Sequence, residues 1–524
     1  MENQKNNNND FKLDNQLKNT ENTLSSSLKR ILNILRDSEH ISGLEALRPL
    51  SQLIVFRLLS DIIKKGSLNI DNSDSYKTYI NPKQNNHYQL NREKLLKYLD
   101  FDLFMEINPS AEKHRIFIRI LKFILSQHNK LCYIYPDEKC MDSIKDENTY
   151  MKIFKELSLH DFSSLNFDIM GFFYEQIIKN NRGNARDQGQ FFTPHNVRRL
   201  LIQLSGISLN DDGTSPLVLD PAAGVSGILC DIINLYKSQS QKQNIDIDWN
   251  QLRNDGINGN EVVASTHQLG YSNLFINSGC TFNNVLCQNS LKDIDNKEYD
   301  YILTNPPFGI NIDYNSIPIE TREKYFPIKT KDAASLFLQM IIHKLKIGGV
   351  CCLVFPYGRQ LSSAGAFVKI RKMLLKTCNV TDMVCIPNST FENTGITTVI
   401  IKFIKHEESN EYKTKNIKFW NYDGNNKNLK IFAKEIQIDE IIKNGFSMIL
   451  ESYLNSNEQI ISGLDKNIKF YKLGEICDVK MGGTPSRSND KYWQNGQNPW
   501  VSVEELNGGF IYDTKEKITD FGVK

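Results

Sequence analysis

The 524-residue sequence lacks the features that mark several classes of protein. Its start, Met-Glu-Asn-Gln-Lys-Asn-Asn-Asn-Asn-Asp, contains no apolar signal core, and no apolar run is long enough to span a membrane. The net charge is only +2, so any contact with nucleic acid must come from local basic patches. We therefore expect a soluble, cytoplasmic protein that has no membrane partner.

Patterns typical of metal sites are also absent. None of the ten cysteines forms a Cys-x-x-Cys pair, and no His is spaced to complete a zinc site. Several cysteines lie in apolar runs such as Val350–Phe355, as small core residues do in a reducing compartment. The sequence therefore predicts free core cysteines and no metal ion.

The first third of the chain has a helical pattern. Residues 1–20 are polar and Asn-rich, which favours a disordered tail. Apolar residues then recur at helical spacing from Leu24 onward, including the segments 50–62, 116–125 and 169–178. Few strand-like runs interrupt them, so we expect residues 21–180 to form an α-helical domain.

After residue 214, short apolar runs alternate with helical patterns. The runs are Leu217–Asp220, Gly256–Glu261, Tyr299–Thr304, Val350–Phe355, Val380–Ile386 and Thr397–Ile404. This repetition predicts a sheet covered on both faces. The expected fold class is α/β, with a Rossmann-like domain (a mixed, doubly wound sheet) over residues 181–405, preceded by the α-helical domain.

Three other stretches have a different composition. Residues 236–255 are expected to be a polar insertion, and residues 406–470 a charged helical and linker region. Residues 471–524 are rich in Gly, Trp and Tyr and carry strand and turn signals, so they are expected to form a separate partial domain.

The turn Asn305-Pro306-Pro307-Phe308 directly follows the strand-like run that ends at Thr304. Such a turn can grip a planar amino group, because the Asn305 oxygen accepts one N–H and the Pro306 carbonyl accepts the other. Phe308 can stack on the attached ring. A plain strand-ending turn is the alternative, since Asn-Pro and Pro-Pro are turn signals in any case.

The segment Asp220–Gly227 follows the first strand and opens a helix, where doubly wound sheets bind ligands. Gly224 and Gly227 permit close approach of a ligand, and the helix N-terminus favours a carboxylate. Asp220 can face an ammonium group, so the zwitterionic end of S-adenosylmethionine would suit the segment. The spacing differs from Gly-x-Gly-x-x-Gly, and a tight turn without a ligand is the alternative.

Three other positions suit the same ligand. Glu261 ends the second strand, where an acidic residue commonly binds ribose hydroxyls, although a solvated Glu is the alternative. Asn289 and Ser290 follow an apolar run and could contact an adenine or form a simple turn.

The segment Gly189–Pro194 precedes an expected helix over His195–Leu204. Its two aromatic residues could form a wall of the ligand site, and Thr193 could reach a carboxylate. A hydrophobic staple with a helix cap and no ligand is the alternative.

Together, Gly189–Pro194, Asp220–Gly227 and Asn305–Phe308 resemble, in this order, the modification subunit of type I restriction-modification systems. The resemblance covers roughly residues 24–405 and includes Gly348–Val350 and Phe391–Gly395. These subunits are methyltransferases that use S-adenosylmethionine and act on the amino group of adenine in DNA. The resemblance implies a methyltransferase domain at 181–405 and an N-terminal helical domain that helps to clamp DNA.

Motifs and resemblance together predict two sets of site residues. The turn Asn305–Phe308 would hold a flipped adenine. The cofactor would be bound by Gln190, Phe191, Phe192, Thr193, Pro194, Asp220, Ala222, Gly224, Val225, Ser226, Gly227, Glu261, Asn289 and Ser290. The chain departs from the family at Ala223 and Val225, where Cys and Ser are frequent, and at Asn289, which replaces a frequent Asp.

The C-terminal segment Leu473–Pro485, with Tyr492-Trp493 and Asn498–Glu504, resembles the start of a target-recognition domain from a specificity subunit. In that family the domain is longer than the stretch left before Lys524. The chain is therefore expected to be a methyltransferase fused to a truncated specificity module.

These features predict direct methyl transfer to adenine N6 in duplex DNA, without a covalent intermediate. The expected partners are double-stranded DNA and a specificity subunit, with a restriction subunit as a further candidate. The basic residues Arg182, Arg186, Arg198 and Arg199 could meet phosphates or remain solvated.

Two other functions stay open. A protein methyltransferase that acts on the side-chain amide of glutamine uses a similar Asn-Pro-Pro-aromatic turn, but such enzymes lack the Gly189–Pro194 segment. A cofactor-binding DNA clamp without activity, left from a degraded restriction locus, would explain the short recognition module.

Overall fold

The computed structural model describes residues 22–64, 79–80, 87–88, 131–135, 144–160, 173, 193–391, 396–407, 411–424, 429–454, 483–487, 489–502, 505 and 513–523. The chain divides into two compact units, Met1–Tyr453 and Leu454–Lys524.

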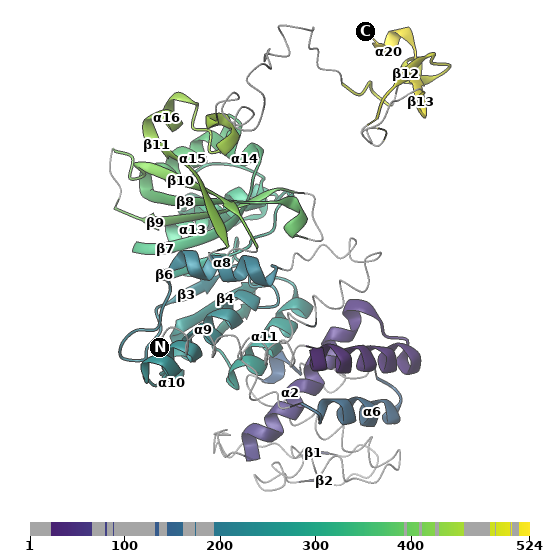
Figure 1. The fold of residues 1–524 in the computed structure, drawn as a ribbon, viewed down its shortest axis with the longest axis vertical. Coiled ribbons are helices and arrows are strands. Elements are labelled where there is room, and N and C mark those ends of the chain that lie inside the picture. Colours follow the sequence, from purple (N-terminus) through teal and green to yellow (C-terminus); the bar gives the residue numbers. More distant parts are fainter. Residues whose placement is uncertain are drawn as a thin grey trace, which may run out of the picture. The chain divides into compact units, whose positions relative to one another are not determined.

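A nine-stranded mixed sheet forms the centre of the first unit (Figure 1). Its order is β11-β10-β8-β9-β7-β6-β3-β4-β5. The strands are β3 (Val218–Asp220), β4 (Ile257–Glu261), β5 (Asn284–Cys287), β6 (Tyr299–Thr304), β7 (Leu345–Pro356), β8 (Cys378–Ile386), β9 (Thr398–Lys405), β10 (Asn416–Tyr422) and β11 (Lys430–Gln437).

Strand directions create the crevice that a ligand needs. Strands β5, β4, β3, β6 and β7 are parallel, whereas β9 is antiparallel to both of its neighbours, β7 and β8. Because β3 lies between β4 and β6, the strand order reverses beside it, and the loops after these strands diverge at their carboxyl ends. The predicted mixed, doubly wound α/β sheet is confirmed.

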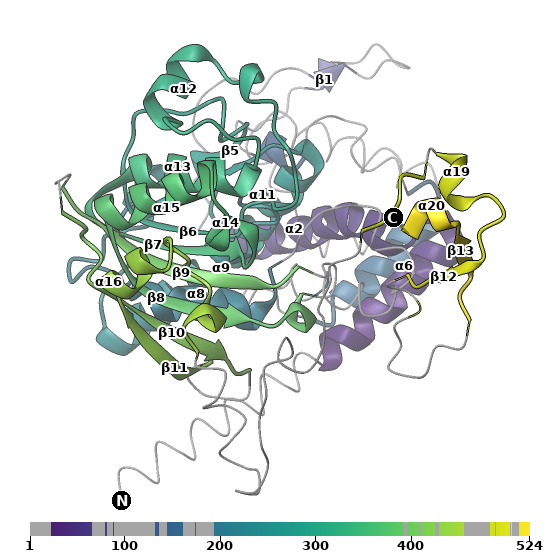
Figure 2. The ribbon, with the colours of Figure 1, turned by 90° about the horizontal axis from the view of Figure 1, so that it is seen from above.

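Helices cover both faces of this sheet (Figure 2). Helices α8, α9 and α11 pack against one another on one face, and α13 and α15 lie on the other. The helical elements from residue 195 onward in this unit are α8 (His195–Ser205), α9 (Gly227–Gln243), α10 (Trp249–Gln251), η5 (Leu252–Gly256), α11 (Ala264–Ser278), η6 (Tyr314–Ser316), α12 (Ile319–Tyr325), α13 (Ala333–Lys344), α14 (Arg359–Ser362), α15 (Ala366–Thr377), η7 (Asn388–Thr390), α16 (Ile438–Lys443) and η8 (Leu450–Tyr453).

The polar insertion expected at 236–255 is largely helical instead. Helix α9 continues to Gln243, ends at Asn244 in the left-handed conformation, and is followed by α10 and η5. The last turns of α9 extend into solvent, so their polar composition concealed the helical pattern.

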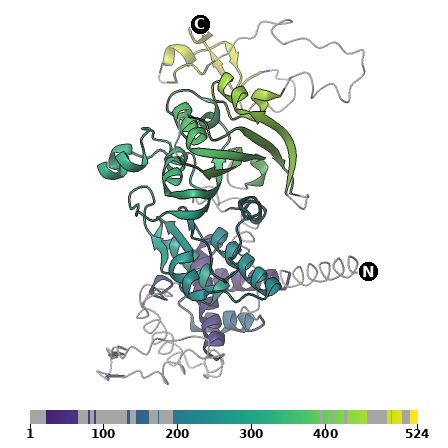
Figure 3. The ribbon, with the colours of Figure 1, turned by 90° about the vertical axis from the view of Figure 1, so that its left-hand side faces the viewer.

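The helical and linker region expected at 406–470 contains two strands of the sheet. Strand β10 pairs parallel with β8, and β11 pairs antiparallel with β10 at the sheet edge; both belong to the light green region in Figure 3. Ile417 and Phe419 are fully buried, whereas Lys418 between them is exposed. This alternation of period two was obscured by the charged residues, although α16 agrees with the helical character expected for this region.

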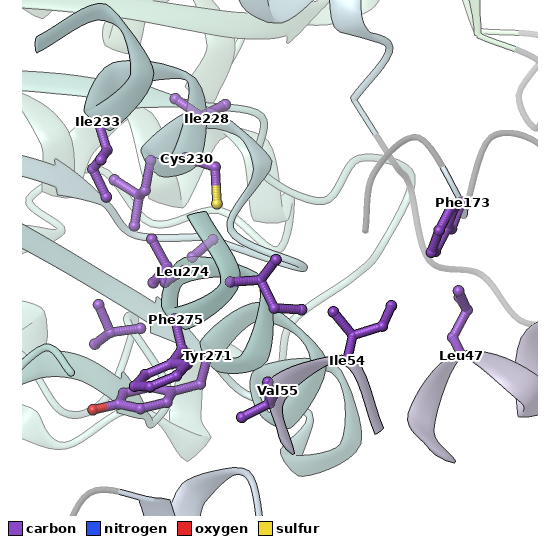
Figure 4. Packing of buried hydrophobic residues seen from close by; sticks show 14 of the residues in the cluster. Leu47, Ile54, Val55, Phe173, Ile228, Cys230, Ile233, Tyr271, Leu274 and Phe275 are labelled. Carbon is purple, nitrogen blue, oxygen red and sulfur yellow. The ribbon is translucent and has the colours of Figure 1, made fainter. Parts of the chain in front are cut away.

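The N-terminal part of the first unit is helical where it is described, as predicted. Residues 22–39 form a helix, followed by η1 (Gly43–Ala46), α2 (Leu47–Lys64), η2 (Leu131–Tyr133) and α6 (Glu147–Leu157). Helix α2 packs on α11, with Ile54 and Val55 beside Tyr271 and Leu274 (Figure 4). A short pair of strands, β1 (Tyr79–Ile80) and β2 (His87–Tyr88), is also described. The helices expected at 116–125 and 169–178 lie essentially outside the described residues.

The second unit contains α19 (Asp490–Trp493), β12 (Asn498–Trp500), β13 (Glu516–Ile518) and α20 (Asp520–Val523). Strands β12 and β13 are antiparallel. Arg487 forms a bidentate ion pair with Glu516, at 2.6 and 2.7 Å, and stacks on the rings of Trp493 and Trp500. This cluster joins the strand pair to the segment before α19.

Two composition-based expectations can be compared with the described residues. Cys230, Cys351, Cys352 and Cys378 are free and buried, as predicted, whereas Cys287 is exposed. Within the described chain, no helix combines the length and apolar character needed to cross a membrane. The expected domain boundaries stay predictions.

Candidate active site

A cavity of about 320 Å³ opens where the carboxyl ends of β3, β4 and β6 meet. Its volume lies within the range of small-molecule sites in proteins. The predicted site residues that line it are Thr193, Asp220, Ala222, Gly224, Val225, Gly227, Glu261, Asn289, Ser290, Asn305 and Pro307. The fold therefore brings together residues from five separate segments of the chain, while their roles remain predictions.

The loop between β3 and α9 forms the floor of this cavity. Gly224 has φ +54° and Ser226 has φ +60°, so both adopt the left-handed conformation that turns the chain sharply into α9. Asn273 of α11 donates to the Val225 carbonyl at 3.0 Å and so ties the loop to α11. A side chain at Gly270 of α11 would lie 2.7 Å from the Gly224 carbonyl oxygen, so α11 and the loop approach very closely.

Asp220 presents a fully buried carboxyl group to the cavity. Its Oδ1 accepts hydrogen bonds from Thr304 Oγ1 at 2.7 Å and from Ala222 N at 3.1 Å. Burial raises the pKa of Asp220 to about 7, and these two hydrogen bonds only partly oppose the effect. A cation bound nearby would favour the ionised form.

Glu261 lines the cavity at the end of β4, the strand next to β3. Its two oxygens accept backbone N–H groups, Oε2 from Gly224 at 3.1 Å and Oε1 from Val263 at 2.8 Å. Burial raises the pKa of Glu261, and the backbone donors reduce this effect. The carboxylate keeps lone pairs toward the cavity, where it could accept hydroxyl groups.

Asn289 and Ser290 form the part of the wall that follows β5. The Asn289 side chain accepts from Leu291 N at 2.9 Å, and the Ser290 hydroxyl donates to the Pro221 carbonyl at 2.6 Å. Each side chain thus stabilises the conformation of the backbone next to the cavity.

Asn305 is anchored on one side of its amide and open on the other. Its Nδ2 donates to Thr193 Oγ1 at 3.0 Å, although the two residues are 112 positions apart. Its Oδ1 is buried, and no described residue donates a hydrogen bond to it. A buried acceptor without a donor is unfavourable, so this oxygen is suited to accept an N–H from a bound molecule.

The remaining residues of the turn are arranged differently from one another. Pro307 lines the cavity, whereas Pro306 is buried and does not. Phe308 is 2% exposed and belongs to the hydrophobic core, so its ring does not face the cavity in this structure. Its predicted stacking on a flipped base stays a prediction, and it would require the ring to move.

The segment before α8 is described only in part. Gln190, Phe191 and Phe192 lie outside the described residues, whereas Thr193 lines the cavity and Pro194 precedes the first residue of α8.

Of the four arginines expected near phosphates, only two are described. Arg198 is 2% exposed, forms a 2.7 Å ion pair with Asp231, and donates to the Thr193 carbonyl at 2.9 Å. The interpretation of Arg198 as a phosphate contact or a solvated residue is therefore wrong, because its charge is paired inside the protein. Arg199 is exposed, and Arg182 and Arg186 lie outside the described residues.

Sequence reasoning missed part of the cavity wall. The missed residues are Arg198, Pro221, Ala223, Ile228, Asn260, Val262, Val263, Thr266, Gln288, Leu291, Ile310, Ile312 and Phe337. Most are apolar or flank a predicted residue, so a search that extended each motif past the end of its strand would have found Val262, Val263 and Gln288.

The available groups fit S-adenosylmethionine. A buried carboxylate suits a cationic end, a second carboxylate suits hydroxyl groups, and apolar side chains such as Val262 and Leu291 suit a flat ring. The unpartnered Asn305 oxygen then remains for a second molecule.

Comparison with known protein families gives two matches. A model described as N-6 DNA Methylase matches residues 165–430, just over half of the chain. A second model, described as Type I restriction modification DNA specificity domain, matches residues 465–523.

Individual proteins agree with these matches. The chain is 27% identical over 409 residues to the type I restriction enzyme EcoEI methylase subunit of Escherichia coli, covering 74% of this chain and 76% of that protein. It is 29% identical over 77 residues to the EcoR124I/EcoR124II specificity subunit of Escherichia coli, covering 15% of this chain and 19% of that subunit. For four other relatives the chain spans 38–48% of their length.

A solved structure shares the fold. The type I restriction-modification system methyltransferase subunit from Streptococcus thermophilus superposes with a TM-score of 0.55 at 18% identity. The alignment covers 83% of this chain and all of that chain.

Proposed function

Because the chain belongs to the N-6 DNA methylase family and carries a type I specificity-domain segment, we propose that it methylates adenine N6 in duplex DNA. The methyl donor would be S-adenosylmethionine, and the chain would act as the modification subunit of a type I restriction-modification system. The cavity at the carboxyl ends of β3, β4 and β6 would hold both the donor and the target base.

The observation that carries this proposal is the orientation of the Asn305 amide. Its nitrogen is occupied by Thr193, so its oxygen is the atom left for a substrate N–H. The amino group of adenine is a poor nucleophile, because its lone pair is delocalised into the ring. An acceptor that holds its N–H bonds supports attack. The Pro306 carbonyl would accept the second N–H, and since Pro306 does not line the cavity in this structure, this would require the turn to adjust.

Access to this oxygen requires the base to leave the helix. Asn305 is only 8% exposed, and the amino group of a stacked adenine could not reach a group at this depth. Enzymes that modify bases commonly rotate the nucleotide out of the duplex into a pocket, which agrees with a buried acceptor.

Bound S-adenosylmethionine would supply an electrophilic methyl group. Asp220 would pair with its ammonium group, Glu261 would accept its ribose hydroxyls, and the backbone of Gly224–Gly227 would receive its carboxylate. Asn289 and Ser290 would lie near its adenine. Gln190, Phe191, Phe192, Thr193 and Pro194 would complete the site.

Duplex DNA and a specificity subunit are the proposed partners, and a restriction subunit is a further candidate. The specificity-domain match at 465–523 supports the first two, because such domains read DNA sequence in this family.

The destination of the methyl group tests the proposal. The full chain is incubated with methyl-labelled cofactor and either duplex DNA or a protein extract, with and without a type I specificity subunit. We expect label in DNA as N6-methyladenine. Label only in protein would favour the glutamine-amide reaction, and cofactor binding without transfer under any condition would favour an inactive clamp.

A further inference from the structure

The loop between β6 and α13 forms one wall of the cavity. Its residues 307–312, here called the wall segment, contribute Pro307, Ile310 and Ile312. The Ile310 carbonyl accepts from Ala333 N at 3.1 Å, and Ile312 N donates to the Lys331 carbonyl at 2.7 Å. The position of the wall segment therefore depends on the residues at the start of α13.

Asp332 fixes that start and is itself held by Gln360 of α14. Its Oδ2 caps α13 by accepting from Ser335 N at 3.0 Å, and its Oδ1 accepts from Gln360 Nε2 at 3.0 Å. Asp332 is 5% exposed and Gln360 8% exposed. A hydrogen bond to a buried carboxylate is among the stronger ones in a protein, so Gln360 holds Asp332 firmly.

Arg371 of α15 locks Gln360 in turn. Its Nη1 donates to the Gln360 carbonyl at 2.8 Å, its Nη2 to the Ser363 carbonyl at 3.0 Å, and its Nε to the Phe446 carbonyl at 2.6 Å. The side chain is 2% exposed, and burial lowers the pKa of Arg371 to about 10, so it remains charged at neutral pH. One guanidinium thus joins the loop after β7 to the segment that begins at Phe446.

That segment, residues 446–451, is here called the anchor segment. Besides the bond from Arg371, Met448 N donates to the Leu361 carbonyl at 2.8 Å and Leu450 N donates to the Tyr357 hydroxyl at 2.7 Å. The same hydroxyl donates to Glu451 at 2.5 Å. The covalent chain passes from the anchor segment into the second unit at Leu454.

We infer that Gln360 is a positioning residue for methyl transfer. Through Asp332 it places the wall segment against the target base, and its own place depends on the docked anchor segment. The anchor segment is thus joined, through hydrogen bonds of Arg371, Gln360 and Asp332, to the wall segment of the cavity. This inference rests on the proposed function, because it concerns the base site of the same reaction.

Replacing Gln360 separates this role from cofactor binding. In the full chain, with the specificity subunit if transfer requires it, Gln360→Ala should lower kcat for DNA about tenfold and raise KM for DNA. Cofactor affinity should change less than about twofold. The carboxylates proposed to bind the cofactor, Asp220 and Glu261, lie on β3 and β4, whereas Gln360 lies on α14. Gln239→Ala is the matched control, since its side chain makes one hydrogen bond, from Leu209 N, that lies outside the path from Asp332 to the anchor segment.

A pH profile gives a readout that a general structural role would not move. Gln360→Glu sets a carboxyl against Asp332, and the charged groups that contact position 360 are Asp332 and, through the main chain, Arg371. Measured relative to the wild-type chain, so that the titration of Asp220 cancels, activity should be low at pH 8 and recover toward pH 6, because only a protonated carboxyl can donate to Asp332. Adding Asp332→Asn should restore activity at pH 8, since the asparagine amide can donate while its oxygen still caps α13.

The anchor segment is tested by Tyr357→Phe, which removes the hydroxyl that contacts Leu450 and Glu451. We expect kcat for DNA to fall as it does in Gln360→Ala, while the cofactor affinity stays unchanged. Tyr314→Phe is the control, because it removes only a bond to the Phe326 carbonyl.

The inference would be overturned if Gln360→Ala had wild-type kinetics, or if it lost cofactor affinity by the same factor as kcat. It would also be overturned if adding Asp332→Asn did not restore the activity of Gln360→Glu at pH 8. If the wild-type chain transfers no methyl group to DNA, the proposed function fails first and this inference falls with it.

Discussion

The buried carboxyl group of Asp220 makes the site sensitive to pH. Its pKa is raised to about 7, above the value of 3.8 for the exposed group. The folded protein therefore holds this proton more tightly than the unfolded chain. Its favourable contribution to stability is present below about pH 4 and is lost as the pH rises through 7.

The first prediction follows from this loss of stability as the pH rises. Asp220→Asn should raise the Tm of the ligand-free protein more at pH 8 than at pH 5.5, because asparagine keeps an acceptor for Thr304 and Ala222 without a buried charge. It should also weaken cofactor binding at pH 8. Thermal denaturation at both pH values, with and without S-adenosylmethionine, checks it, and an equal Tm change at both pH values would refute it.

Phe308 leads to a second prediction. Because the ring is 2% exposed and packs in the core, Phe308→Ala should destabilise the protein by about 3–5 kcal/mol, as large-to-small core changes do. Phe308→Leu should retain most of the stability. Denaturant unfolding measures both, and an unchanged midpoint for Phe308→Ala would show that the ring is not part of the core in solution.

The sequence predicted individual site residues only where local chain geometry decides their position. Asp220, Glu261 and Asn305 each stand at or just after the end of a strand, so their placement at one sheet edge followed from the strand pattern. The role of Arg198 could not be predicted, since its partner Asp231 is 33 residues away and meets it only through the packing of α8 on α9. The buried ring of Phe308 likewise depends on tertiary contacts.

At the scale of elements, the close contact between α11 and the loop after β3 shapes the cofactor side of the cavity. Gly270→Ala would set a methyl group 2.7 Å from both the Gly224 carbonyl oxygen and Ser226 Oγ. We predict that the loop shifts and that the Kd for S-adenosylmethionine rises about tenfold, because overpacking costs about 1–3 kcal/mol. Calorimetric titration measures the Kd.

The control for this change is Ser265→Ala, at an exposed position on the same helix. Wild-type affinity in Gly270→Ala would mean that α11 does not set the loop.

Elements were predicted well where burial was complete. Strands β3, β6 and β9 read as continuous apolar runs because both sheet faces are covered, and their bounds differ from the structure by few residues. Strands β10 and β11 were missed, since β10 has only two buried residues, Ile417 and Phe419, and β11 only one, Ile436, near the sheet edge. Helix α9 was cut short for the same reason, its last turns being polar.

At the scale of the whole molecule, an N-6 DNA methylase region and a type I specificity segment lie on one chain. The order of motifs in the sequence predicts this arrangement, because each motif carries its own local chemistry. The buried path from Asp332 through Gln360 and Arg371 to Phe446 could not be read from the sequence, since it joins residues up to 75 positions apart by side-chain contacts alone.

The proposed methyl transfer depends on the Asn305 oxygen as the acceptor of an adenine N–H. The most direct measurement is single-turnover methyl transfer to duplex DNA by the wild-type chain and by Asn305→Ala, with cofactor Kd measured on the same samples. We predict a fall in rate of about 100-fold or more and a Kd within a few-fold of wild type. Transfer by Asn305→Ala at close to the wild-type rate would contradict the account.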